Sequence, residues 1–242
     1  MGDTARTAAV VVLAGGSGTR LGADRNKVYL PLGDVPLLAW SLRTLDAVPG
    51  TVAMVLVIRP GDETDAEAAI AAAAPATPVT VVAGGPTRAA SERAGLVPLR
   101  PGIADGSIEV VLVHDGARPL VSAALAGAVD RAARRHGGAI PGLPIAGEIL
   151  VDAGDRLVPA DIEHLRGVQT PQGFRARALV AAHDAAAADG FEALDTAAMV
   201  ARYAGIAAAV VPGDPRNLKV TTAEDLEHAR RLAGSGGRAQ DP

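Results

Sequence analysis

Short runs of apolar residues alternate along this chain with longer segments in which apolar positions recur at helical spacing. The runs lack the polar alternation of a half-exposed strand, which favours strands buried on both faces of a sheet. The predicted strands are 10–13, 51–58, 78–83, 108–113, 139–145 and 206–211, with 217–220 as a candidate short strand. The predicted helices are 36–48, 62–74, 87–99, 122–136, 175–189, 195–204 and 223–232.

The alternation of strands and helices predicts an α/β fold, with a mostly parallel twisted sheet and helices on both faces. Residues 1–233 are interpreted as a single domain, because 242 residues suffice for one substantial core. The glycine-rich segment 234–242 has the composition of a disordered tail. Residues 146–165 show weak periodicity and scattered charge, which indicates an excursion from the main sheet rather than a core element.

A glycine-rich loop with two cations directly follows the first predicted strand. Gly15, Gly16 and Gly18 remove side chains that would keep a polyanion from the backbone N–H groups. Arg20 and Lys27 add positive charge beside them. The loop lacks both the Gly-Lys pair of a Walker A loop and the third glycine of the dinucleotide fingerprint. It therefore predicts another kind of phosphate site; the alternative is a tight turn whose cations face solvent.

Ligands of such sheets bind beyond the carboxyl ends of the strands, which selects particular loops of this chain. These loops are 14–27, 84–91, 114–119 and the approach to Lys219. Asp115 follows a buried strand and is placed to hold a hard cation such as Mg²⁺, which needs only one or two carboxylates beside substrate phosphates. The alternative for Asp115 is an Asp-Gly turn with a local hydrogen bond.

Two further side chains of the 114–119 loop bear on the chemistry. The planar guanidinium of Arg118 is suited to take two oxygens of an acceptor's phosphate. His114 lies beside the same turn, and we interpret it as a structural residue rather than a general base.

Composition narrows the classes of function. The net charge is −4 and no lysine or arginine run is present, so the sequence gives no electrostatic sign of nucleic-acid binding. Cysteine is absent, which excludes disulfides, zinc–thiolate sites and cysteine nucleophiles. No apolar stretch is long enough for a membrane span, and residues 1–9 do not resemble a signal peptide. We expect a cytoplasmic protein that binds neither membrane nor nucleic acid.

Several segments together carry a resemblance to a known family. They are LAGGSGTRL with Lys27, GGPTRAAS at 84–91, VHDGARP at 113–119, VQTPQGF at 168–174 and NLKVTTAEDL at 217–226. In this order and spacing they resemble the 2-C-methyl-D-erythritol 4-phosphate cytidylyltransferases and the related ribitol-5-phosphate cytidylyltransferases, in the sugar-nucleotidyltransferase superfamily. The resemblance implies an enzyme that transfers CMP from CTP to a polyol phosphate with the help of Mg²⁺. It also implies a Rossmann-like fold.

The resemblance further implies roles for particular residues. It implies that the catalytic residues are Arg20, Lys27 and Lys219, which would hold the triphosphate. Nucleotide binding falls to Ala14, Gly15, Gly16, Ser17, Gly18, Gly84, Gly85 and Ser91. Asp115 would bind metal and nucleotide, and Arg118 is compatible with binding the acceptor. Residues 146–165 match the position of an arm through which family members form homodimers, each subunit helping to complete its neighbour's acceptor pocket.

Departures from the family pattern concentrate on the acceptor side. The usual Pro-Lys-Gln reads Asn26-Lys27-Val28 here, a change that we expect to be tolerated. In the arm, Glu148 stands where a threonine that touches the acceptor is usual, and Leu150 replaces a lysine. A carboxylate near a phosphate is repulsive unless Arg156 or Arg166 neutralises it. Glu148 is therefore a candidate acceptor-binding residue that could instead favour a different polyol.

Three functions remain as hypotheses at this point. The first is a methylerythritol-phosphate cytidylyltransferase, and the second is a cytidylyltransferase for another polyol or sugar phosphate such as ribitol 5-phosphate. The third is a nucleotide-binding protein without catalysis, which the retained Arg20, Lys27, Asp115 and Lys219 disfavour.

Overall fold

The computed structural model describes residues 7–16, 26–147, 149–152, 154–160, 163–193 and 195–236. Its strands are β1 (Ala8–Leu13), β2 (Pro31–Leu32), β3 (Val35–Pro36), β4 (Thr51–Ile58), β5 (Val79–Ala83), β6 (Val110–Asp115), β7 (Gly138–Pro144), β8 (Leu150–Asp152), β9 (Leu157–Pro159), β10 (Arg166–Val168), β11 (Gln172–Arg175) and β12 (Ala209–Pro212). Its helices are α1 (Leu37–Asp46), α2 (Glu63–Ala73), α3 (Arg88–Leu96), α4 (Arg100–Asp105), α5 (Ala123–His136), α6 (Ala176–Ala188), α7 (Thr196–Ala204) and α8 (Ala223–Gly236), with 3-10 turns η2 (Lys27–Tyr29) and η3 (Val97–Leu99).

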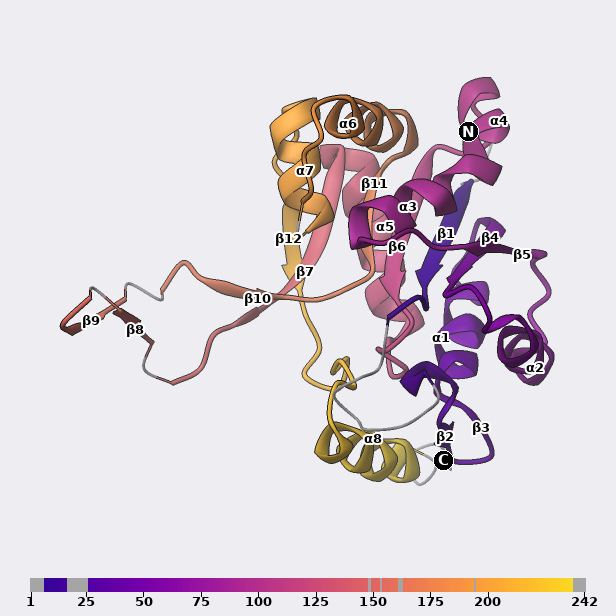
Figure 1. Ribbon diagram of the computed structural model, residues 1–242, viewed down its shortest axis with the longest axis horizontal. Coiled ribbons are helices and arrows are strands. Elements are labelled where there is room, and N and C mark those ends of the chain that lie inside the picture. The colour runs from indigo at the N-terminus through magenta and orange to yellow at the C-terminus, as the bar shows by residue number, and fades with distance from the viewer. Residues whose placement is uncertain are drawn as a thin grey trace, which may run out of the picture.

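The described residues form one central sheet of eight strands in the order β10-β7-β11-β6-β1-β4-β5, with β12 also paired to β7 (Figure 1). β1 is parallel to both β4 and β6, β5 is parallel to β4, and β12 is parallel to β7. β11 runs antiparallel between β6 and β7, and β10 runs antiparallel to β7. The mostly parallel α/β sheet predicted from the sequence is confirmed.

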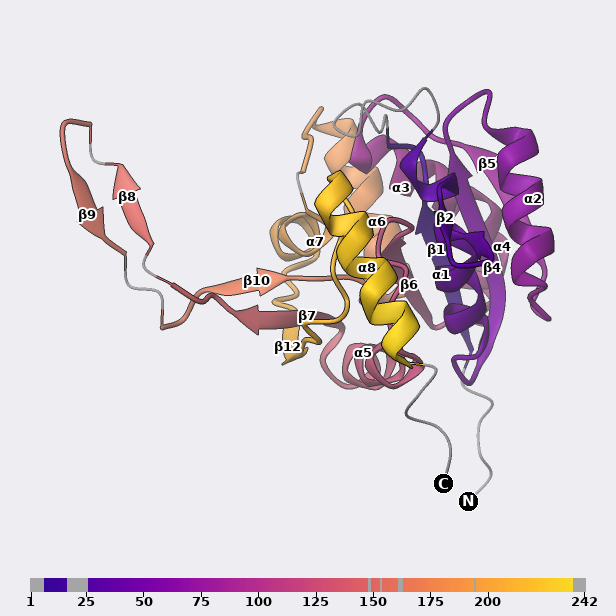
Figure 2. The same cartoon turned by 90° about the horizontal axis from the view of Figure 1, so that it is seen from below.

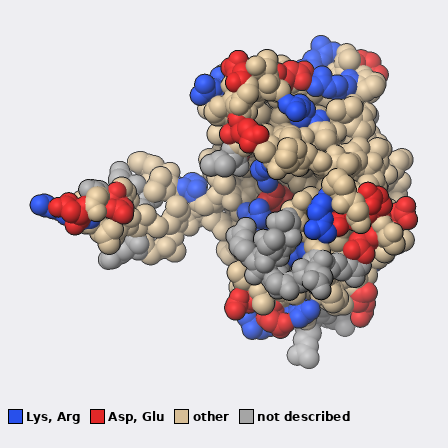
Figure 3. All heavy atoms as spheres, in the orientation of Figure 1, with Lys and Arg blue, Asp and Glu red and all other residues tan. Residues whose placement is uncertain are grey.

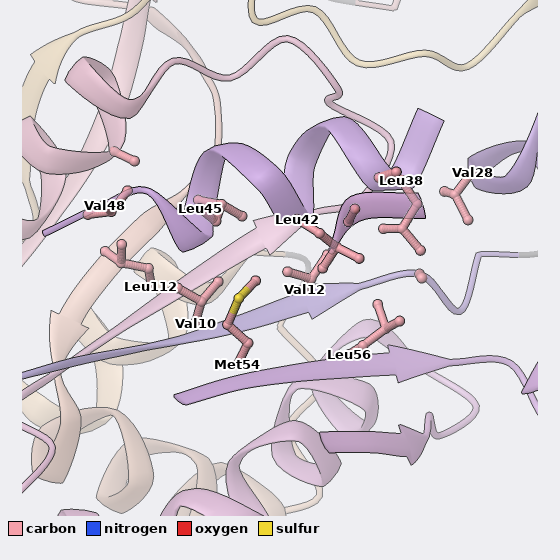
Figure 4. Close-up of a cluster of buried hydrophobic side chains, with 14 of the residues drawn as sticks. Val10, Val12, Val28, Leu38, Leu42, Leu45, Val48, Met54, Leu56 and Leu112 are labelled. Carbon is pink, nitrogen blue, oxygen red and sulfur yellow. The ribbon is translucent and has the colours of Figure 1, made fainter. Parts of the chain in front are cut away.

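The core lies on both faces of this sheet because β1 is apolar at every position. Val10 and Val12 face the layer that contains α1, α2 and α5, and Val11 faces the layer that contains α3, α6 and α7. In α1 the residues Leu38, Leu42 and Leu45 lie on one helical face, and Figure 4 shows them against the strands β1 and β4. The central strands are thereby fixed, and their carboxyl ends offer a rigid edge.

The arm leaves this body between β7 and β10. Figures 1 and 2 both show β8 and β9 far from the sheet, where they pair only with each other in antiparallel register. The side chains of Leu150, Val151 and Leu157 are 47%, 51% and 64% exposed. Figure 3 shows charged residues gathered at the far end of the arm and mostly uncharged residues toward the body. The predicted excursion at 146–165 is confirmed, and it carries apolar side chains that the described chain does not cover.

The structure differs from the sequence predictions in several local elements. Neither β11 nor α4 is among the elements predicted from the sequence. The candidate strand at 217–220 is wrong: Val220 N–H donates to Ala117 O at 2.8 Å, but the segment joins no sheet. The helix α8 extends to Gly236, so residues 234–236 of the predicted tail are helical and the rest lies outside the described residues.

None of the described helices is long and apolar enough to cross a membrane.

Candidate active site

A cleft of about 470 Å³ opens at the carboxyl ends of the parallel strands. Three of the selected loops and the approach to Lys219 contribute to its lining, as the sheet topology predicts. Among the residues expected from the sequence, the lining includes Ala14, Gly15, Gly16, Lys27, Gly85, Ser91, Asp115 and Lys219. Ser17, Gly18, Arg20 and Glu148 lie outside the described residues, so their predicted roles stay predictions.

Asp115, the last residue of β6, lies between two cations. Its Oδ2 accepts a hydrogen bond from Lys219 Nζ at 2.7 Å, and its Oδ1 accepts one from Arg88 Nη1. The backbone N–H of Asp115 donates to Thr170 Oγ1 at 3.0 Å. Burial alone would raise the pKa of Asp115, but Arg88 and Lys219 outweigh burial and hold this pKa well below its usual range. The carboxylate is therefore ionised at neutral pH.

Arg88 is the functional candidate that the sequence analysis missed. It is the first residue of α3, and its Nε lies 2.9 Å from Oε1 of the buried Glu92. Glu92 in turn accepts hydrogen bonds from Thr196 Oγ1 at 2.9 and 3.0 Å, which joins the cleft to the start of α7. The signal was present in the segment GGPTRAAS, where Arg88 stands three residues after the glycine pair, in one of the selected loops.

The glycine pair after β5 allows the chain to pass close to α3. A Cβ atom on Gly85 would lie 2.5 Å from the Cβ of Ala90, so a larger residue there would displace the helix. Ser91 Oγ accepts from Gly85 N–H at 3.1 Å and also contacts Gly85 O at 3.2 Å. Gly84 does not line the cleft; its N–H donates to Ile58 O at 2.7 Å. Gly85 and Ser91 thus form the wall on this side, with Gly84 behind them.

His114 and Arg118 support the cleft from behind. Burial lowers the pKa of His114 to about 4, and its Nδ1 and Nε2 lie 3.2 Å from Thr170 Oγ1 and Arg118 O. The imidazole is therefore neutral at pH 7, and its hydrogen bonds agree with the structural role predicted for it. Arg118 donates to Asn217 O at 2.7 Å and to Val168 O at 3.4 Å, and it is not part of the cleft lining. The structure therefore brings Lys27, Asp115 and Lys219 together but leaves Arg118 beside them.

Metal-binding capacity at the cleft rests on one carboxylate. The described residues contain no group of three or more His, Cys, Asp or Glu side chains that could hold a metal by themselves. Asp115 is the acidic residue of the described lining. This donor set fits Mg²⁺ that arrives with phosphate groups, because magnesium takes one or two carboxylates and completes its shell with water and phosphate oxygens. It does not fit an all-protein metal cage.

The fold and the cleft define a class of protein. A mostly parallel α/β sheet that presents a glycine-lined, cation-rich cleft at its carboxyl edge is the architecture of a nucleotidyltransferase-like protein. The family model described as "IspD: 2-C-methyl-D-erythritol 4-phosphate cytidylyltransferase" matches residues 8–234. The chain therefore belongs to the IspD family, and the resemblance found in its motifs is confirmed.

Individual relatives agree with this placement. The chain is 46% identical over 239 residues to the "Bifunctional enzyme IspD/IspF" of Clavibacter michiganensis, covering 94% of this chain and 55% of that protein. It is 40% identical over 230 residues to the "2-C-methyl-D-erythritol 4-phosphate cytidylyltransferase" of Cereibacter sphaeroides strain ATCC 17029, covering 93% of this chain and 96% of that protein. The crystal structure of 2-C-methyl-D-erythritol 4-phosphate cytidylyltransferase from Thermus thermophilus matches with a TM-score of 0.70 and 30% identity, covering 93% and 98% of the two chains. The chain thus spans about half the length of the bifunctional relative.

Proposed function

We propose that this chain transfers CMP from CTP to 2-C-methyl-D-erythritol 4-phosphate and releases pyrophosphate. The observation that carries the proposal is the family match over residues 8–234, which includes every described loop of the cleft. The Cereibacter sphaeroides relative, which has nearly the same length, is named for this activity. Lys27, Arg88 and Lys219 give the cleft the positive charge that a triphosphate needs.

The proposed reaction is an in-line displacement at phosphorus. An oxygen of the acceptor's phosphate forms a bond to the α-phosphorus of CTP, and the bond to the β-phosphate breaks with its electrons leaving on pyrophosphate. The attacking oxygen is already anionic, so no general base has to remove a proton. The neutral, buried His114 is consistent with this, because it faces Thr170 and a backbone carbonyl rather than the cleft.

The chain's own residues would lower the barrier by position and charge. Lys27 comes from the turn η2 and Lys219 from the approach to α8, so they reach the cleft from separate elements. Both are placed to stabilise negative charge that builds on the phosphates in the transition state. Lys219 has a side chain that is 41% exposed, and it can exchange Asp115 for a phosphate oxygen without unfolding any element. The predicted role of Arg20 belongs to the same proposal.

Magnesium would be held by Asp115 together with the nucleotide. Each oxygen of the carboxylate accepts a hydrogen bond from one cationic side chain and keeps a further lone pair. When bound, Mg²⁺ supplies charge neutralisation between the phosphate groups. Arg88 and Lys219 orient the carboxylate that would receive it.

We also infer a homodimer from the arm. The hairpin of β8 and β9 packs on no other described element, and isolated two-stranded hairpins are marginally stable at best in water. Its exposed Leu150, Val151 and Leu157 would gain by burial against a second copy. Such an arrangement would place Glu148 at a neighbour's acceptor pocket, as the family resemblance implies.

Pyrophosphate release tests the activity directly. Purified protein with CTP and Mg²⁺ is expected to release pyrophosphate only when methylerythritol phosphate is added, and phosphorus NMR should show the new diphosphate diester. UTP, ATP and GTP serve as nucleotide controls. Release that does not depend on the acceptor, or that is equal with every nucleotide, would contradict the proposed function.

A further inference from the structure

Asn26 occupies the position directly before Lys27 and is 1% exposed. Its Nδ2 donates to Ala14 O at 2.6 Å and to Asp62 Oδ2 at 3.0 Å. Its Oδ1 accepts from Val28 N–H at 3.4 Å and so caps the turn that carries Lys27. One side chain thus joins the carboxyl end of β1 to the turn η2.

The partners of Asn26 are themselves fixed to the sheet. Asp62 is 4% exposed, and its Oδ1 accepts from Arg59 Nη2 at 2.6 Å and from Arg59 Nε at 3.2 Å. Ala14 N–H donates to Val57 O at 2.7 Å, which extends the pairing of β1 with β4. Asn26 is therefore held between the end of β1 and Asp62, the residue directly before α2, and both amide hydrogens have an acceptor.

The side chain of Asn26, and not its backbone, distinguishes this chain from the family pattern. The backbone at Asn26 has φ −61°, which is a value that proline adopts. The proline that is usual at this position would therefore suit the torsion but could donate no hydrogen bond. In this chain a proline would leave Ala14 O and one oxygen of Asp62 without the donor that now meets them.

We propose that Asn26 is a positioning residue that fixes the base of the Lys27 side chain relative to the phosphate site. The proposal rests on the proposed function, because it assumes that Lys27 acts on the phosphates of CTP. Lysine has a long flexible stem, so the ammonium group is placed precisely only if its backbone is held. A displacement of about 1 Å at a catalytic group costs roughly 100-fold in rate.

Two substitutions at Asn26 test this role against a matched control. Asn26→Asp keeps the shape but turns the donor into a carboxylate that faces Ala14 O and Asp62. Asn26→Pro keeps the backbone torsion and removes the side-chain hydrogen bonds. The control is Asp130→Asn in α5, an equally isosteric change of a buried side chain, whose carboxylate accepts from Arg134 Nε at 3.0 and 3.1 Å and does not line the cleft.

Steady-state kinetics and melting curves should be recorded for all four proteins. We expect kcat to fall by about 100-fold in both Asn26 variants, with KM for the acceptor unchanged. Asp130→Asn should lower the melting temperature while leaving kcat near the wild-type value. A kcat within about threefold of wild type in a folded Asn26 variant would overturn the proposal, as would an equal loss of kcat in the control. If Asn26→Asp does not fold, Asn26→Pro decides.

A binding measurement separates this proposal from the proposed function. Calorimetry with magnesium pyrophosphate needs neither the acceptor nor turnover. If the wild type shows no acceptor-dependent activity, the proposed function fails, while weaker pyrophosphate binding by Asn26→Pro than by Asp130→Asn would still support positioning of Lys27. Equal binding by both variants, or no binding by the wild type, would overturn the positioning role.

Discussion

The cleft and the arm are built in opposite ways. In the cleft, Asp115 contacts Arg88 and Lys219 of the same chain, and the strands beneath are buried on both faces. In the arm, β8 and β9 contact each other, and Leu157 remains 64% exposed. The described part of the cleft is therefore built within a single chain, whereas the strands of the arm pair only with each other. Variants of the two regions should accordingly affect different measurements.

The largest effect is expected from Lys27→Ala. Loss of a preorganised charge that acts on the transition state should lower kcat by about 10²- to 10³-fold, while the fold is retained. Steady-state kinetics and a melting curve check both parts. Arg230→Ala on the exposed side of α8 removes a similar charge elsewhere and should leave kcat near wild type. Near-normal turnover of Lys27→Ala would remove the central support for a phosphate site in this cleft.

A smaller loss, seen mainly in stability, is expected from Arg88→Ala. The change leaves the buried Glu92 and the carboxylate of Asp115 each without one cation. Removing one partner of a buried ion pair lowers the free energy of unfolding. We expect a cost of about 3 kcal/mol, at the lower end of the usual range, because Arg88 is partly exposed. Urea unfolding of wild type, Arg88→Ala and Arg88→Lys measures this cost. The lysine variant should recover part of it, and equal stability of all three proteins would show that the network does not hold the cleft.

Sequence patterns anticipated the parallel strands well because their signal is local. The unbroken apolar run of β1 and the helical spacing of Leu38, Leu42 and Leu45 each follow from a few neighbouring residues. β11 has no such signal: it places Gln172 and Phe174 in the interior, and its position between β6 and β7 depends on contacts far away in sequence.

Some residues of the candidate site could likewise be predicted from the sequence, and others could not. Ligands of such sheets bind beyond the carboxyl ends of the strands, so the sequence alone predicts that Lys27, Asp115 and Lys219 lie near one another. In the structure all three line one cleft. Arg88 was missed because a charged residue at the start of a helix is usually solvated. Only the three-dimensional position of β6 shows that its last residue, Asp115, lies against the side chain of Arg88. Arg118 was expected at the cleft, but the carbonyls of Asn217 and Val168 hold it aside, and no sequence pattern reveals those partners.

His114, which lies behind the cleft, should make the free energy of unfolding depend on pH. His114 has a pKa of about 4 in the folded protein, below its ordinary value of 6.5, so the unfolded chain takes up the proton first as the pH falls. Its contribution to stability is complete above pH 6.5 and is lost as the pH falls toward 4, by roughly 2–3 kcal/mol. Asp115 stays ionised over this window because its pKa is held low.

Comparison with His114→Gln isolates this contribution. The glutamine can still donate toward Arg118 O but does not titrate. Chemical unfolding at several pH values should show the wild type losing stability more steeply than the variant between pH 6.5 and 4. Parallel curves for the two proteins would mean that His114 titrates normally in the folded state.

The smallest effect on the cleft is expected from the arm variant Leu157→Glu. A charge on the exposed face of β9 should convert the proposed dimer to a monomer in sedimentation at micromolar concentration. Binding of CTP with Mg²⁺ by the same protein should change by no more than about twofold, because the substitution is on the surface and far from the cleft. A monomeric wild type would refute the dimer, and a strong loss of CTP affinity in the variant would refute the independence of the two regions.

Acceptor selectivity is the most direct test of the function proposed for the whole chain. The measurement is kcat/KM at saturating CTP for 2-C-methyl-D-erythritol 4-phosphate and for ribitol 5-phosphate. We expect a value above about 10⁴ M⁻¹s⁻¹ for methylerythritol phosphate and a lower value for ribitol phosphate. A lower value for methylerythritol phosphate together with a higher one for ribitol phosphate would contradict the proposed function and would favour a cytidylyltransferase for a different polyol phosphate.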